Sequence, residues 1–146
     1  MIPAHLTSSG RVLLSDLDDD EFTRKFTGAV FEPGGPSLRV RDIDGLRRCV
    51  IAARRAGLSI VDEEFEAGLV GVAAPVRDFT GTIIAAINVG GPKDRLGKHL
   101  DGAGAEVIEA AQSLSERLGF PTSRARGLAP QDFGPGQVLV NSRFTW

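Results

Sequence analysis

The chain has 146 residues, a length typical of one domain and sufficient to bury a core. Its 17 basic and 19 acidic side chains leave a formal net charge of -2, which argues against a nucleic-acid-binding module because such modules usually carry a basic face. The single cysteine, Cys49, excludes an internal disulfide and a Cys-rich metal site. The first ten residues lack the apolar core of a signal peptide, and no apolar run approaches the ~18 residues of a membrane helix. We therefore expect a cytoplasmic protein that makes no membrane contact.

Four stretches carry apolar residues at spacings of three and four, which indicates helices with one buried face. The first three follow residues whose side-chain oxygens can cap a helix, and the third and fourth are followed by a glycine. In chain order, the expected helices cover residues 9–17, 18–26, 45–56 and 100–118. Cys49 lies on the apolar face of the third helix, which favours a buried structural thiol. The four arginines of that helix, Arg47, Arg48, Arg54 and Arg55, are expected to face water.

Three short apolar stretches between the third and fourth helices predict strands, at residues 58–63, 69–77 and 82–90. The last two are joined by a tight hairpin loop. Because they are too apolar for a sheet with one solvent-exposed face, we expect both faces to be covered. The order of elements predicts an α+β fold in which helices pack on an antiparallel sheet. From residue 120 onward proline and glycine recur, which predicts a loosely ordered C-terminal tail, with a strand-like run at 137–140 and Trp146 as a local docking point.

Motifs of enzymes are largely absent. His5 and His99 are not at metal-ligand spacing, and neither a nucleophile elbow nor a P-loop occurs. The acidic run of residues 62–64 together with Glu66 could hold a divalent cation, but a solvated strand end is the favoured interpretation. We therefore expect neither catalytic residues nor a metal site nor a cofactor.

Polar groups at the ends of apolar elements suggest a binding site. Ser8 and Ser9 lie at a helix start, where unpaired backbone N–H groups and the helix dipole favour an anion, although both serines could be simple caps. Asn88 interrupts an apolar strand and must find hydrogen-bond partners, either in the backbone or in a ligand. Gly71 leaves room beside a second strand. Together these features predict a small pocket on a sheet, suited to a small organic acid.

Two strings of residues resemble the effector-binding domain of IclR-family transcriptional regulators. They run from Val61 to Asp78, beginning VDEEFEAGLVGVAAPV, and from Gly81 to Pro92, with the sequence GTIIAAINVGGP. The opening string HLTSSGRVLLS at residues 5–15 is similar to the helix start of that domain, and RRAG at 54–57 matches as well. The resemblance spans residues 3–119 and ends where the tail begins.

The resemblance implies a GAF-like domain that binds small metabolites, often carboxylates or aromatic acids, and modulates the affinity of a regulator for operator DNA. Carried over by position, the ligand-binding residues are Ser8, Ser9, Val61, Leu69, Gly71, Asn88 and Gly90. Three of these positions depart from family members that hold a small keto acid with polar groups, because Val61, Gly71 and Gly90 offer no side-chain hydrogen bond. The space left by the glycines favours a larger, flatter ligand such as an aromatic acid.

The family also carries an N-terminal winged helix-turn-helix, and its effector domain starts with strands before the first helix found here. Neither is present, so we expect residues 1–119 to form a partial effector-binding domain that reaches DNA only through a domain not in this chain. The missing strands should expose a sheet edge and favour a homodimer or homotetramer. The alternative is a stand-alone metabolite-binding protein or a small enzyme on a GAF-like fold, which a metal at the acidic run or a carboxylate beside His5 would favour.

Overall fold

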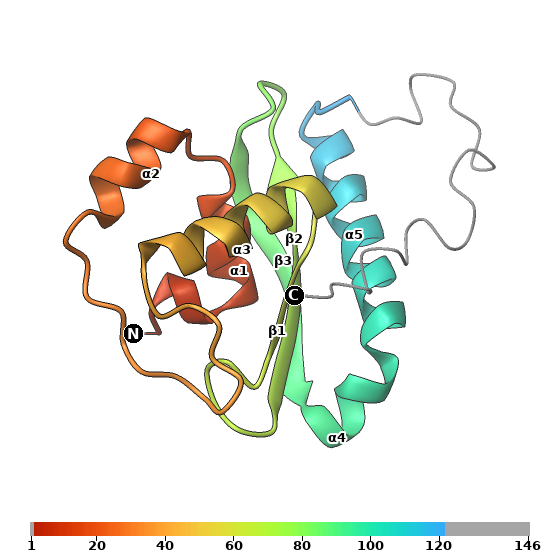
Figure 1. The fold of residues 1–146 in the computed structure, drawn as a ribbon. Coiled ribbons are helices and arrows are strands. Elements are labelled where there is room, and N and C mark those ends of the chain that lie inside the picture. The colour runs from red at the N-terminus through yellow and green to blue at the C-terminus, as the bar shows by residue number, and fades with distance from the viewer. Residues whose placement is uncertain (1, 122–146) are drawn as a thin grey trace.

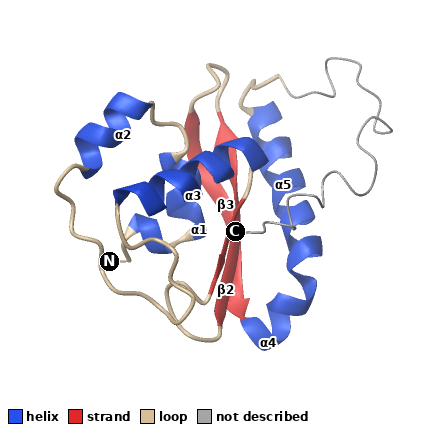
Figure 2. Cartoon of the chain, in the orientation of Figure 1, coloured by secondary structure: helices blue, strands red, loops and turns tan. Residues whose placement is uncertain are grey.

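The computed structural model describes residues 2–121, in which helices cover both faces of a three-stranded antiparallel sheet (Figure 1). The elements follow in the order η1 (Ala4–Leu6), α1 (Ser8–Leu14), α2 (Asp19–Phe26), α3 (Ile43–Ala56), β1 (Ser59–Asp62), β2 (Leu69–Arg77), β3 (Ile83–Pro92), α4 (Lys93–Leu96), η2 (Gly97–His99) and α5 (Leu100–Arg117). The sheet order is β1-β2-β3, with helices α1 to α3 on one side and α5 on the other (Figure 2). The predicted α+β class is confirmed, while the predicted tail features at 137–140 and Trp146 lie outside the described residues.

The helix ends follow the local signals in the sequence. Asp18 and Glu21 form a capping box at the start of α2, in which the Glu21 N–H donates to Asp18 Oδ1 over 2.7 Å. Asp42 accepts a hydrogen bond from the Gly45 N–H at the start of α3, and Gly57 ends that helix with a φ of +62°. The first helix begins one residue earlier than expected, at Ser8, because Thr7 is its cap.

Strand β2 forms the centre of the fold. It pairs with β1 on one side and β3 on the other, and its buried residues face α1 on one face of the sheet and α5 on the opposite face. The core between β2 and α5 includes Val72, Val76, Val107 and Ala111. A second core joins α1, α2 and α3 and contains Cys49, whose pKa is raised by burial, as expected for a structural thiol.

The expectation that both hairpin strands are covered on both faces holds for β2 but is wrong for β3. Ile84 and Val89 of β3 are 52% and 42% exposed. The reason is position in the sheet, since among the described residues β3 is an edge strand with a hydrogen-bonded neighbour on one side only. In the part of the chain that the structure describes, its apolar sequence therefore leaves hydrophobic surface exposed and one row of backbone groups without a strand partner.

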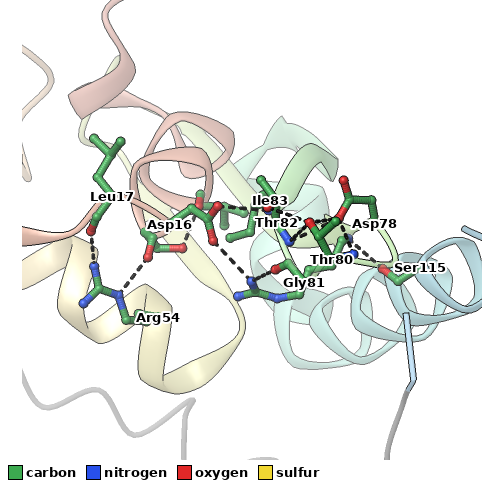
Figure 3. Close-up of polar contacts among 12 residues, drawn as sticks. Asp16, Leu17, Arg54, Asp78, Thr80, Gly81, Thr82, Ile83 and Ser115 are labelled. Carbon is green, nitrogen blue, oxygen red and sulfur yellow. Dashed lines mark hydrogen bonds and ion pairs between the residues drawn. The ribbon is translucent and has the colours of Figure 1, made fainter. Parts of the chain in front are cut away.

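Two of the arginines of α3 do more than face water. Arg54 donates from Nε to the Ser15 carbonyl over 2.7 Å and from Nη2 to the Leu17 carbonyl, so it binds the chain that follows α1 (Figure 3). Arg47 bonds Asp19 of α2 and lies over the Phe22 ring. The solvated-face interpretation was therefore incomplete, because these contacts join helices that are distant in the sequence.

Polar contacts close to those of Arg54 stabilise the β2–β3 hairpin. Asp16 pairs with Arg77 and accepts a hydrogen bond from the Ile83 N–H over 3.1 Å, while Asp78 organises the turn through Thr80 (Figure 3). These contacts hold the hairpin against the segment that links α1 to α2.

Candidate ligand-binding site

A pocket of about 230 Å³ lies between the first turn of α1 and the sheet. All seven residues predicted for the site line it: Ser8, Ser9, Val61, Leu69, Gly71, Asn88 and Gly90. Five further residues complete its wall: Ile2, Leu6, Thr7, Phe65 and Val70. The sequence interpretation missed these five because four are ordinary apolar residues, and Thr7 was considered only as a helix cap.

The register of the sheet explains why residues from three strands meet. Gly71 pairs with Val61 on one side and with Gly90 on the other, so one row across the sheet supplies three lining residues. Helix α1 crosses this row, and a Cβ atom at Gly71 would lie 3.3 Å from the Ser8 Oγ. Glycine at this position therefore permits the close approach of α1 and leaves the pocket open.

The polar groups of the pocket cluster at the start of α1. The Thr7 hydroxyl accepts a hydrogen bond from the Gly10 N–H over 3.0 Å. The backbone N–H groups of Ser8 and Ser9 lie in the first turn of α1, where N–H groups have no acceptor within the helix. The Ser8 residue is buried, with 5% of its surface exposed. None of the described lining residues carries a charged side chain, so hydroxyl, amide and backbone groups would have to bind an acidic ligand here.

Asn88 differs from its prediction. We expected a buried amide that requires partners, whereas the residue is exposed on the edge strand β3 and its side chain makes no hydrogen bond within residues 2–121. The buried-amide argument therefore does not apply. Asn88 instead lies at the pocket wall with its donor and acceptor available to a ligand.

The acidic run after β1 also differs from its prediction. Glu64 is fully buried, which overturns the solvated-end interpretation for this residue. Its carboxylate accepts hydrogen bonds from Arg11 of α1, from Nη1 over 2.9 Å and from Nη2 over 2.6 Å. The partners are separated by 53 residues, so no local signal could pair them.

Two half-buried members of the acidic run pair with a lysine. Lys93 lies 2.9 Å from Asp62 and 2.7 Å from Glu63. The hydrogen bond between Lys93 and Glu63 lowers the pKa of Glu63 and raises the pKa of Lys93. Among residues 2–121, no group of three or more His, Cys, Asp or Glu side chains is arranged to hold a metal ion.

His5 lies outside the pocket wall. Its ring packs edge-on against Phe31 at 5.2 Å, and its Nε2 faces the backbone oxygen of Glu32 at 3.5 Å rather than a carboxylate. Burial lowers the pKa of His5, because the charged ring loses hydration.

This shift predicts a pH dependence of stability. In the unfolded chain His5 takes up a proton at a higher pH than in the folded chain, so acidification from pH 7 to 5 favours the unfolded chain at this residue. We expect the free energy of unfolding, measured by urea titration, to fall over this range. The fall should be smaller in His5→Gln, and an identical pH dependence in both proteins would contradict the assignment.

A second, larger hollow of about 450 Å³ lies between the end of α3, β2 and α5. Ala74, Ala111, Ser115 and Phe120 are among its lining residues, and none of the predicted site residues reaches it. Arg77 at its border is already paired with Asp16. This hollow provides an internal comparison for any ligand-binding measurement.

The structure is an α+β domain with a pocket between the first turn of α1 and the sheet. Residues 1–116 match the model of the family described as bacterial transcriptional regulator IclR C-terminal, so the chain belongs to the IclR family of bacterial transcriptional regulators. Within residues 2–121 no helix is both long and apolar enough to cross a membrane.

Three similar proteins illustrate the relationship. The Pca regulon regulatory protein of Pseudomonas putida is 36% identical over 88 residues, which are 60% of this chain and 30% of that protein. The double mutant of the PobR inducer-binding domain from Acinetobacter, in complex with 3-hydroxybenzoic acid, has a TM-score of 0.70 and 28% identity, covering 78% of this chain and 66% of that one. An IclR homologue from Microbacterium hydrocarbonoxydans, in complex with 4-hydroxybenzoate, has a TM-score of 0.69 and 29% identity, covering 80% and 46%. The chain spans less than half the length of the curated relatives that it matches, with 30% of the Pca regulon regulatory protein and 44% of the repressor AllR of Klebsiella pneumoniae covered.

Proposed function

We propose that this chain is the small-molecule-sensing and oligomerising domain of an IclR-type transcriptional regulator, and that the pocket at the start of α1 binds an aromatic or other small organic acid. The observation that carries the proposal is the convergence of seven residues, named from a family resemblance, on a single pocket. Two solved structures similar to this chain are complexes with hydroxybenzoates, which supports the same class of ligand here.

The chemistry of the wall supports an aromatic acid over a small keto acid. Val61 and Phe65 provide apolar surface for a ring, and the glycines at 71 and 90 leave space beside it. The hydroxyl and N–H groups of Ser8 and Ser9 would bind the carboxylate. Asn88 would bind a ring hydroxyl at the other side of the pocket.

The proposed sensing domain performs no catalysis. A ligand that binds one arrangement of the oligomer more tightly shifts the population toward it, and this changes the spacing of the DNA-reading parts of the whole regulator. DNA contact would come from a winged helix-turn-helix outside this chain, and the regulator would work in the cytoplasm.

The proposal is tested by thermal unfolding of the purified chain with benzoate, 3-hydroxybenzoate, 4-hydroxybenzoate, pyruvate and glyoxylate. A ligand at 100 times its Kd should add about 2.7 kcal/mol of stability, enough to raise Tm by several degrees. The rise should be reduced in Ser8→Ala and in Asn88→Leu, and retained in Thr82→Ala, a change on the hairpin outside the pocket. Stabilisation by none of the acids would contradict the proposal, and stabilisation by the keto acids alone would contradict the preference for an aromatic acid. Turnover of a bound acid would favour the enzyme alternative.

We also propose that the domain self-associates through the open edge of β3. Within residues 2–121 the strand has a hydrogen-bonded neighbour on one side only, and its ten residues carry no charge that would oppose pairing with a second copy. Light scattering after size exclusion should give a dimer or tetramer. Ile84→Lys combined with Val89→Lys should give a monomer, whereas Val30→Lys, at a site 89% exposed and away from the sheet, should not. A monomeric wild-type chain would contradict this proposal.

A further inference from the structure

The buried ion pair between Arg11 and Glu64 is part of a larger set of contacts. Arg11 also donates from Nε and Nη2 to the His5 carbonyl, at 3.0 and 2.9 Å. Glu64 Oε2 additionally accepts a hydrogen bond from the Arg39 N–H over 3.2 Å. Arg11 is 2% exposed and Glu64 is fully buried, so the two charges are removed from water and satisfied within one network.

Three members of this network are close in sequence to residues of the pocket wall. His5 precedes Leu6, Arg11 follows Ser9 by two residues, and Glu64 precedes Phe65. The network therefore joins the start of α1 to the loop between β1 and β2, and both segments contribute residues to the pocket wall. The acidic run contributes this contact through its only fully buried member.

The energetics indicate that stability alone does not account for this pair. Removing two charges from water is costly, and apolar residues of similar size often stabilise a core equally well. A guanidinium that forms two parallel bonds to a carboxylate, however, fixes both partners in distance and orientation more strictly than apolar packing does. Such a contact suits a site where two segments, here the start of α1 and the loop between β1 and β2, must be held at a fixed distance.

We infer that Arg11 and Glu64 are positioning residues of the ligand pocket, which hold the Ser8–Ser9 turn of α1 at the distance from Phe65 that an aromatic acid requires. The inference rests on the proposed function of the pocket. Neither side chain lines the pocket, so both act through the residues beside them.

The affinity test compares Glu64→Gln and Arg11→Lys with Val107→Ala, a core change on the far side of the sheet that involves no pocket residue. The Kd of 4-hydroxybenzoate is measured by calorimetry at a temperature where circular dichroism shows each variant to be folded. We expect the Kd to rise roughly tenfold in the two ion-pair variants, the scale typical of residues that orient a binding group. In Val107→Ala the change should stay below about twofold. Equal Kd values in all three variants would overturn the inference.

A second measurement needs no ligand and separates this inference from the proposed function. Hydrogen exchange is followed at the Gly10 and Leu69 amides, whose bonds to the Thr7 hydroxyl and the Glu66 carbonyl close the α1 turn and the loop. In Glu64→Gln both should exchange faster by a larger factor than the amides shared by β2 and β3. A uniform change across the domain would overturn the positioning role even if the acid binds. Failure of every acid to bind, with selective loosening of these amides, would overturn the proposed function alone.

Discussion

Glu64→Ala should lower the free energy of unfolding by about 3–5 kcal/mol, because it leaves the buried Arg11 guanidinium without its counter-charge. The two hydrogen bonds from Arg11 to the His5 carbonyl remain, but they neutralise no charge. Since domains of this size are stable by only about 5–15 kcal/mol, this change should remove a large fraction of the total.

The measurement is urea unfolding followed by circular dichroism, with Asp19→Ala as the matched control. Asp19 also pairs with an arginine, Arg47, but its side chain is 81% exposed, so removing it should change stability little. If Glu64→Ala and Asp19→Ala lower the free energy of unfolding by the same amount, the buried pair contributes no more to stability than an exposed pair does, which contradicts this prediction.

Gly71→Leu should weaken binding of an aromatic acid by more than about 100-fold, while the sheet still forms. The new side chain would start 3.3 Å from the Ser8 Oγ and extend into a pocket of about 230 Å³. The leucine side chain would occupy much of the space that an aromatic ring needs. A ligand excluded from this space would lose most of its van der Waals contacts with the pocket. The Kd of 4-hydroxybenzoate, measured by calorimetry, provides the readout.

The control for this prediction is Gly91→Leu. Gly91 lies on the adjacent strand, opposite Val70, and a Cβ atom placed there meets no other residue within 4 Å. It makes no contribution to the pocket wall, so the control variant should bind like the wild type. Loss of binding in both variants would mean that leucine in the sheet, rather than occupation of the pocket, causes the effect.

The parts of the fold that follow from local chemistry were predictable from the sequence. The capping box of Asp18 and Glu21, the αL glycine at position 57 and the apolar run of β2 each act over a few residues, and the structure has all three. The position of a strand within the sheet is not local. For that reason the exposure of β3, and with it that of Asn88, was predicted wrongly.

The candidate site shows the same division. The resemblance supplied positions on α1 and on three strands, and the register of the sheet brings them together. Phe65 and Leu6 carried no polar signal that would mark them as part of a pocket. The pairing of Arg11 with Glu64 depends on how α1 packs on the sheet, and a charged residue within an apolar helix was the single indication of it.

The proposal that the pocket at the start of α1 binds an aromatic acid can be tested by titrating the ¹⁵N-labelled chain with 4-hydroxybenzoate and following the backbone amides by NMR. We expect saturable chemical-shift changes that concentrate at the pocket wall, at Ser8, Ser9, Gly71, Asn88 and Gly90, and that disappear in Gly71→Leu. Shifts that concentrate instead at Ala111 and Ser115, beside the larger hollow, would contradict it, as would a spectrum that does not change.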